Sequence, residues 1–268
     1  FSPVQPPRVL LEHVPKVHFY EGGARCPEDL CFASVMRAIV EYLGEADYGC
    51  RHGAPITPKC KVSCTYSFML GVTGTAFFLC WGQGWQLDNV EIMYMSDDPG
   101  APSRRAFEAI GYAQEYVDNQ ARGEDYTRQR IIESLRDKGR PIIAYGIIGP
   151  PEACIITGYD EGGDVLMGWS FFQNDPHSNA GVAFEPTGQF RKRDWFKDLQ
   201  GLHIIGEKGE KPSLSGTYHS ALQWGVELAR RQRVTIYGRE RAVGLAAYDA
   251  WAETICRDED LPADNEAL

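Results

Sequence analysis

Three short apolar runs separated by turn residues form the clearest feature of the hydrophobic pattern. Residues 141–148, 153–157 and 164–172 are rich in Ile, Val, Trp and Phe, which fit a pleated, buried surface. The stretches 149–151 and 161–163 consist of Gly, Pro and Glu, and Gly-Gly supplies the positive φ that a tight hairpin needs. The pattern predicts a three-stranded antiparallel meander, with helices covering at least one face.

A helical period follows the first 25 residues. Pro27 stands where proline is favoured, at the first helical position, and Gly44 is a C-cap residue. Apolar residues recur between them at spacings of three and four, which predicts an amphipathic helix: Phe32, Val35, Ile39 and Leu43.

Weaker patterns predict the remaining elements. Helices are expected at 67–72, 104–113, 125–135, 218–233 and 240–256, and strands at 9–11, 14–20, 75–81, 202–206 and 234–237. The stretch 208–215 reads as a linker. We therefore expect an α+β fold, with a domain over residues 1–207 and a C-terminal helical segment over 208–268 packed on it.

Composition limits the classes of function. The chain has 268 residues, of which 43% are hydrophobic and 24% charged, as in ordinary globular proteins. A net charge of −10 argues against nucleic acid as a partner. No apolar run reaches the roughly 20 residues of a membrane span, and FSPVQPPRVLL at the start lacks a signal-peptide pattern. We expect a cytoplasmic protein without a cofactor that acts on a small-molecule or peptide substrate, with homo-oligomerisation left open.

The 8 cysteines are far too few for a disulfide scaffold and are predicted to be reduced thiols. Four soft ligands fall close together: Cys50, His52, Cys60 and Cys64. They could hold zinc, but their spacing matches no known zinc motif. A zinc-stabilised interaction module built on these four residues is a third hypothesis of function. The alternative is that each thiol packs locally, and no metal site is predicted.

Cys31 is the candidate nucleophile. It lies in or just after the first turn of the predicted helix, where the helix dipole lowers the pKa of a thiol. Glu28 and Asp29 come just before it and oppose thiolate formation. A buried structural cysteine is the alternative.

Four stretches carry a resemblance to a known fold: CFASVMRAIVEYLG (31–44), GTAFFL (74–79), EACIITGYD (152–160) and GLAAYDAW (244–251). Together they resemble the papain-like cysteine fold, and within it the butirosin biosynthesis protein H N-terminal-like group and the related bacteriocin-leader peptidases. The resemblance implies acyl transfer: peptide hydrolysis, or movement of an acyl group from a carrier-bound thioester to an amine.

The chain departs from this family at one position. In the enzymes, the strand ending in Gly-Tyr-Asp begins with a histidine that takes the proton of the cysteine, and a later Asp or Asn orients its ring. Here Glu152 occupies the histidine position, and Asp175 is the candidate later acid. A carboxylate with an ordinary pKa of about 4.3 is a poor base for a thiol. His18 or His177 could fold back to Cys31 instead.

Two hypotheses therefore stay open. The first is an acyl transferase or hydrolase that uses Cys31. The second is an inactive relative that binds a small amine or peptide beside Glu152. The candidate ligand-binding residues are Glu28, Trp81, Tyr159 and Trp169.

Overall fold

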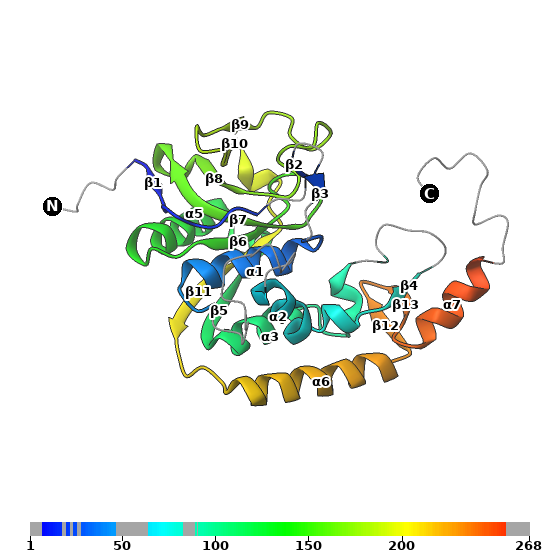
Figure 1. The fold of residues 1–268 in the computed structure, drawn as a ribbon. Helices are drawn as coiled ribbons and strands as arrows, with labels where there is room; N and C mark the ends of the chain where they lie inside the picture. Colours follow the sequence, from blue (N-terminus) through cyan, green and yellow to red (C-terminus); the bar gives the residue numbers. More distant parts are fainter. Residues whose placement is uncertain are drawn as a thin grey trace. The chain divides into compact units, whose positions relative to one another are not determined.

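The computed structural model describes residues 7–17, 20–21, 24–25, 28–46, 64–82, 89 and 91–255 (Figure 1). The predicted α+β fold is confirmed, because helices combine with a large antiparallel sheet. The chain forms two compact units, one from residues 1–67 and 110–210 and the other from 68–109 and 211–268. This division differs from the predicted 1–207 and 208–268, since residues 68–109 group with the C-terminal part.

The first unit is built on the large sheet, whose strands run in the order β5-β11-β6-β7-β8-β10-β9. A further short strand, β1, pairs with β7. Their bounds are β1 Val9–Leu10, β5 Tyr112–Asp118, β6 Ile142–Tyr145, β7 Ala153–Asp160, β8 Val165–Trp169, β9 Ala183–Phe184, β10 Phe190–Arg193 and β11 Gly201–Lys208. A separate hairpin joins β2 (Tyr20–Glu21) to β3 (Ala24–Arg25).

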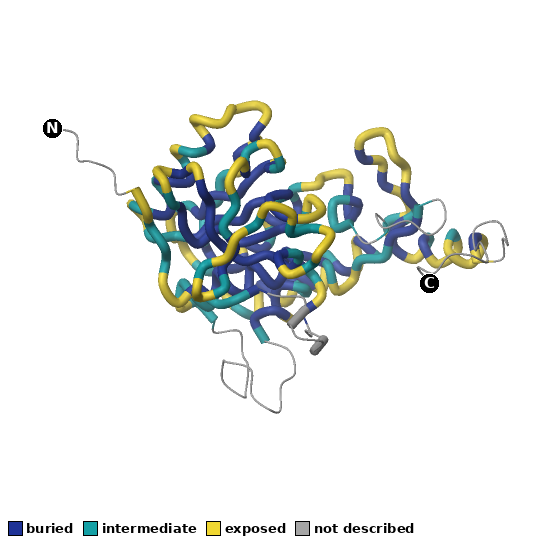
Figure 2. Tube along the Cα trace, turned by 90° about the horizontal axis from the view of Figure 1, so that it is seen from above, coloured by how far each residue is buried: buried dark blue, intermediate teal, exposed yellow. Residues whose placement is uncertain are grey.

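The predicted meander is confirmed as β6, β7 and β8. Each neighbouring pair is antiparallel, with Tyr145 opposite Ala153 and Ile155 opposite Trp169. A short 3₁₀ turn (Glu161–Gly163) joins β7 to β8, and both of its glycines have positive φ, as the Gly-Gly pattern predicts. These strands run through the interior of the unit, where the tube in Figure 2 is mostly dark blue.

Each face of the large sheet has its own cover. Alternate residues point to one side, where Ala144, Cys154 and Leu202 join a hydrophobic core with Ile131 and Leu135. Those last two belong to α5 (Glu124–Ile132) and to the π-helical turn Glu133–Asp137 that continues it. The helix that packs against β7 and begins with Cys31 is α1 (Cys31–Tyr42). A short helix, α4 (Asn119–Arg122), follows β5.

The start of α1 differs from the prediction. The helix begins at Cys31, so Glu28 and Asp29 precede it and do not lie in its first turn. Residues 26 and 27, on which the predicted start rested, lie outside the described ranges. Leu30 is the N-cap residue and makes no side-chain cap. The Cys31 thiol therefore belongs to the residue that opens the helix, where its own backbone lowers its pKa in part.

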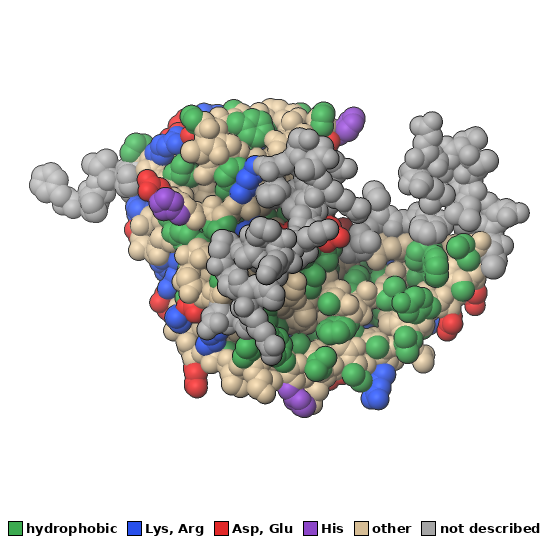
Figure 3. Space-filling view, in the orientation of Figure 1, with side chains coloured by type: hydrophobic (Ala, Val, Ile, Leu, Met, Phe, Trp, Pro, Cys, Tyr) green, Lys and Arg blue, Asp and Glu red, His purple; other side chains and the backbone are tan. Residues whose placement is uncertain are grey.

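The second unit combines helices with a small sheet in the order β12-β13-β4. Its main elements are α2 (Cys64–Thr73, whose first turn belongs to the first unit), β4 (Cys80–Trp81), α3 (Ala101–Ile110), α6 (Leu214–Arg230), β12 (Arg233–Ile236), β13 (Arg239–Val243) and α7 (Ala246–Ile255). Helices α6 and α7 expose apolar side chains, and Figure 3 shows hydrophobic groups gathered over this unit. Among the most exposed are Leu222, Leu245 and Tyr248.

Several predicted elements were wrong in detail. The predicted strand 14–20 has no regular structure over residues 14–17. The predicted strand 75–81 is a 3₁₀ turn (Thr75–Phe77) followed by the two-residue strand β4. The helix predicted at 104–113 is α3, which ends at Ile110, and the chain then enters β5. The helix predicted from residue 240 begins only at Ala246, because Arg239–Val243 pairs with β12. No helix among the described residues is long and apolar enough to cross a bilayer.

Candidate active site

Cys31 and Glu152 lie together in the first unit. The Cys31 side chain is only 7% exposed and lies close enough to the Glu152 carboxylate for each group to shift the pKa of the other. Cys31 is placed by the start of α1, and Glu152 by the turn that leads into β7. The expectation that a glutamate stands beside the candidate nucleophile therefore agrees with the geometry.

The electrostatics of this pair differ from the expected activated thiol. Burial raises the pKa of the Cys31 thiol, and the charge of Glu152 and the hydrogen bond to it raise this pKa further. Burial also raises the pKa of Glu152, while the hydrogen bond from Cys31 lowers it in part. Desolvation thus outweighs the helix dipole, and the resting site holds a thiol and not a thiolate.

No histidine takes part in this contact among the described residues. The groups that act on Cys31 are Glu152 and the nearby Cys154. His177 is exposed, and its backbone N–H donates to Asp175 in its own turn. His18 lies outside the described residues.

Polar aromatic side chains extend the site along the sheet. Val117, Ala144 and Leu202 point into the core with α5. Their neighbours Tyr116, Tyr145 and His203 must therefore point to the other face, because strand residues alternate. The His203 ring lies 5.0 Å from the Tyr116 ring and 5.8 Å from the Tyr145 ring, between centroids.

His203 is a neutral member of this group. It is 5% exposed, and burial lowers its pKa to about 4. Its Nδ1 lies 2.6 Å from the amide oxygen of Gln114. Because an amide oxygen can only accept, Nδ1 carries the proton and Nε2 is the acceptor nitrogen.

Tyr145 neighbours both the His203 ring and Glu152. Burial raises the pKa of its phenol, and the charges of Tyr116, Glu152 and Cys154 act in the same direction. Sequence reasoning missed Tyr145 and His203. A histidine within the apolar run Leu202–Ile205 was the available signal, since a polar side chain at a buried strand position requires a partner.

Asp175 and Glu28 serve their local structure. Asp175 accepts from the Ser178 hydroxyl at 2.5 Å and from the backbone of His177 at 3.1 Å, which lowers its pKa. Its carboxylate is engaged within its own loop, so the predicted role beside Cys31 has no geometric support. Glu28 is buried and accepts from Arg37 at 2.9 Å and from Ser34 at 2.5 Å. It holds the chain before α1, which leaves no support for the predicted ligand-binding role.

The three predicted aromatic ligand-binding residues belong to different units or to different faces of the large sheet. Trp81 belongs to the second unit, where its Nε1 donates to Thr254 at 2.9 Å. Tyr159 is fully buried in the core beneath α5. Trp169 lies opposite Ile155, with the Lys16 ammonium 5.4 Å from its ring centre. Its Nε1 has no hydrogen-bond partner among the described residues. Of these three, only Trp169 is placed on the α1 side of the sheet.

The cysteine-rich stretch gives no metal centre in the described residues. Cys50, His52 and Cys60 lie outside them, and no cluster of metal-binding side chains occurs among the residues described. Cys64 is disulfide-bonded, whereas Cys31, Cys80 and Cys154 are free. The prediction of reduced thiols was therefore wrong for Cys64, and a disulfide sulfur is not a thiolate ligand.

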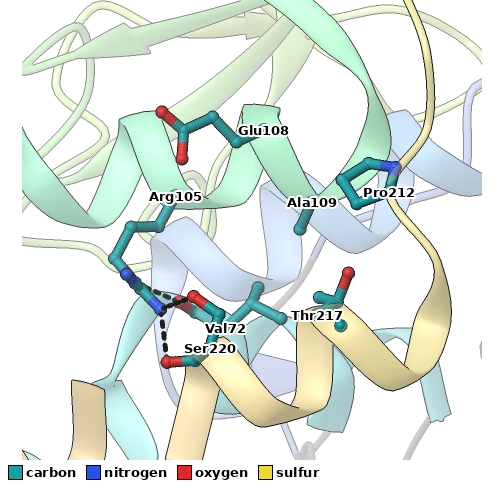
Figure 4. Close-up of a pocket in the computed structure, with 8 residues that line it drawn as sticks. Val72, Arg105, Glu108, Ala109, Pro212, Thr217 and Ser220 are labelled. Carbon is teal, nitrogen blue, oxygen red and sulfur yellow. Dashed lines mark hydrogen bonds between the residues drawn. The ribbon is translucent and has the colours of Figure 1, made fainter. Parts of the chain in front are cut away.

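A separate cavity of about 200 Å³ occurs in the second unit, and Figure 4 shows its lining. Arg105 spans it, donating to the Val72 carbonyl at 2.9 Å and to Ser220 at 3.1 and 3.2 Å. Its guanidinium also lies over the Trp224 ring. None of the predicted site residues lines this cavity, and Arg105 is used to join α2 to α6.

Comparison with known proteins gives no relative for this chain. No protein-family model matches it, and no match was found among the curated proteins or the solved structures.

Proposed function

We propose that the first unit is a cysteine-dependent acyl transferase or amide or thioester hydrolase of the papain-like kind. The observation that carries the proposal is the closeness of the buried Cys31 thiol, at the start of α1, to the Glu152 carboxylate, at the start of β7. Cys31 at the start of a helix packed on an antiparallel sheet, as in the fold that the sequence resembles, supports it as well.

Glu152 is the general base in this proposal. Its raised pKa makes the ionised carboxylate a stronger base than an ordinary glutamate, closer to the working pH. Because the resting thiol is protonated, proton removal accompanies attack and does not precede it. This differs from a stable cysteine–histidine ion pair.

The proposed reaction has two steps. The sulfur of Cys31 attacks the carbonyl carbon of a thioester or amide, and its proton passes to Glu152. The S–C bond forms, the bond from that carbon to the leaving group breaks, and Glu152 returns the proton to the leaving thiolate or amine. An amine or water then attacks the acyl-enzyme and restores the Cys31 thiol with the help of Glu152.

A simple thioester tests the proposal. The protein is incubated with S-acetyl-N-acetylcysteamine, and acetylation is followed by intact mass and peptide mapping. We expect one acetyl group on Cys31 and none in Cys31→Ser. Consumption of the thioester no faster than with Cys31→Ser, and no adduct, would contradict an acyl-transfer function.

A binding protein is the second candidate, favoured by the burial and raised pKa of Cys31. A bound ammonium group would stabilise Glu152 as the anion, so the ligand would be a small amine or a peptide amine. In this case Cys31 should react with iodoacetamide no faster than a free thiol. Butylamine should bind in calorimetry and lose affinity in Glu152→Gln. Selective, fast alkylation at neutral pH would contradict this candidate.

The proposal includes a cytoplasmic location, because a nucleophilic cysteine must stay reduced. The free thiols of Cys31, Cys80 and Cys154 support it, and the disulfide at Cys64 argues against it. A small-molecule or peptide substrate follows from the chemistry, no nucleic-acid or membrane partner is proposed, and a homo-oligomer stays open.

A further inference from the structure

Tyr145 lies beside Glu152 through the pairing of β6 with β7. It is the last residue of β6 and stands opposite Ala153, the residue after Glu152. The next backbone N–H, that of Gly146, donates to the Glu152 carbonyl at 3.4 Å. The strand register therefore fixes Tyr145 next to the residue that contacts Cys31.

The Tyr145 ring has a fixed environment. The backbone carbonyl of Tyr145 accepts from the backbone N–H of Gln200 at 2.9 Å, and the ring packs edge-on against His203. The hydroxyl of Tyr116, on β5, lies over Gly201 of β11. It is 2.2 Å from the position that a Cβ on Gly201 would take. Gly201 is directly opposite Tyr145. A larger residue there would displace the aromatic group that surrounds Tyr145.

The Tyr145 hydroxyl is uncommitted. It makes no hydrogen bond within the described part of the chain, although Glu152 is a neighbour, and the side chain is only half-buried. A half-buried hydroxyl without a partner among the described residues is available to donate to a ligand. A donor next to the residue that acts on the nucleophile fits the stabilisation of a developing oxyanion.

We propose that Tyr145 donates a hydrogen bond to the carbonyl oxygen of the acyl substrate as Cys31 attacks it. This inference rests on the proposed function and adds a substrate-contacting residue to it. Negative charge moves onto the carbonyl oxygen when the S–C bond forms. It leaves that oxygen when the carbonyl re-forms and the leaving group departs. The raised pKa of the phenol keeps it protonated, and hence a donor, throughout the neutral range.

Two reactions of the same cysteine separate this role from a structural one. Acetylation by S-acetyl-N-acetylcysteamine passes through an oxyanion, whereas alkylation by iodoacetamide forms none. In Tyr145→Phe we expect acetylation to slow by about 10²-fold, in the range for loss of one oxyanion donor. Alkylation should stay within about twofold of the parent protein, since the nucleophile is unchanged.

Tyr126→Phe is the matched control, because it removes a hydroxyl from an exposed tyrosine of α5 that is not part of the polar aromatic group. It should leave both rates within about threefold, as its ring position is retained. Equal acetylation rates in Tyr145→Phe and the parent would overturn the inference while leaving the proposed function intact. A parallel fall of both rates in Tyr145→Phe would assign Tyr145 to the structure of the site and overturn it too. No acetylation of the parent protein would remove the proposed function, and this inference with it.

Discussion

Two buried or half-buried glutamates of the first unit have different chemistry because they meet different partners. Glu28 is held by the Arg37 guanidinium and the Ser34 hydroxyl. Glu152 meets the neutral thiol of Cys31, and burial raises its pKa. The raised pKa makes Glu152 a stronger base than an ordinary glutamate. Local pairing thus separates a structural acid from a candidate base.

His203 gives a prediction at the same scale. Its folded pKa of about 4 lies below the ordinary 6.5. The unfolded chain therefore binds an extra proton between these values, and the free energy of unfolding should fall as pH drops from about 6.5 to about 4. The full difference is about 3 kcal/mol. Urea unfolding over this pH range should show it in the parent protein and not in His203→Asn.

The exposed His177 supplies the control for this measurement. His177→Asn should keep the acid dependence of the parent protein, because this exposed side chain is not part of the group that surrounds His203. Loss of the dependence in His177→Asn, or its persistence in His203→Asn, would contradict the assignment of a neutral buried ring to His203.

At the scale of elements, the pairing of β7 with β8 depends on one glycine. A Cβ on Gly168 would lie 2.0 Å from the Ile155 carbonyl oxygen, which belongs to the backbone of the neighbouring strand. The register shifts between Ile156 and Gly158, which brings these two backbones close. Only a residue without a side chain fits there.

Gly168→Ala should therefore destabilise the protein by about 3 kcal/mol, since the backbone must move to relieve the overlap. Gly71, inside α2, is the matched control, because nothing lies within 4 Å of its added Cβ and its φ is ordinary. Gly71→Ala should stabilise by about 0.5–1 kcal/mol through helix propensity. Thermal and urea unfolding of both variants measure the difference, and equal effects would contradict this account of the sheet.

The sequence predicted those elements whose residues carry a strong local pattern. The meander and α1 are mostly buried, so their apolar periodicity is plain. Strand β5 is largely polar and exposed, and it forms because it pairs with β11, which is distant in the chain. Strand β13 also lacks a clear apolar pattern, because its first two residues are charged and exposed, and it forms by pairing with β12. Non-local pairing gives no periodic signal of its own.

The same reason limits prediction of the site. Cys31 and Glu152 were found from their places at the start of a helix and of a strand. Tyr145 and His203 join them only through the register of β6 with β7 and β11. The pKa of Cys31 also needed the structure, because burial decides it and burial cannot be derived from the helix dipole.

At the scale of the whole molecule, each compact unit has its own character. The first unit contains the Cys31–Glu152 pair and the polar aromatic group. The second unit resumes at residue 211, within the predicted linker 208–215. Among the described residues, it carries most of the exposed large apolar side chains. The chemistry proposed for this protein therefore requires only residues of the first unit.

Comparison of two Cys31 reactions in Glu152→Gln tests the central claim most directly. The charge of Glu152 raises the pKa of the Cys31 thiol. Replacing it with neutral glutamine should therefore increase the thiolate fraction and speed alkylation by iodoacetamide at pH 8. The same change removes the general base, so acetylation by S-acetyl-N-acetylcysteamine should fall by about 10²-fold. Glu161→Gln, at an exposed position, should change neither rate. Opposite shifts in the two rates are the predicted result, and unchanged acetylation or a parallel fall in both rates would contradict Glu152 as the base for Cys31.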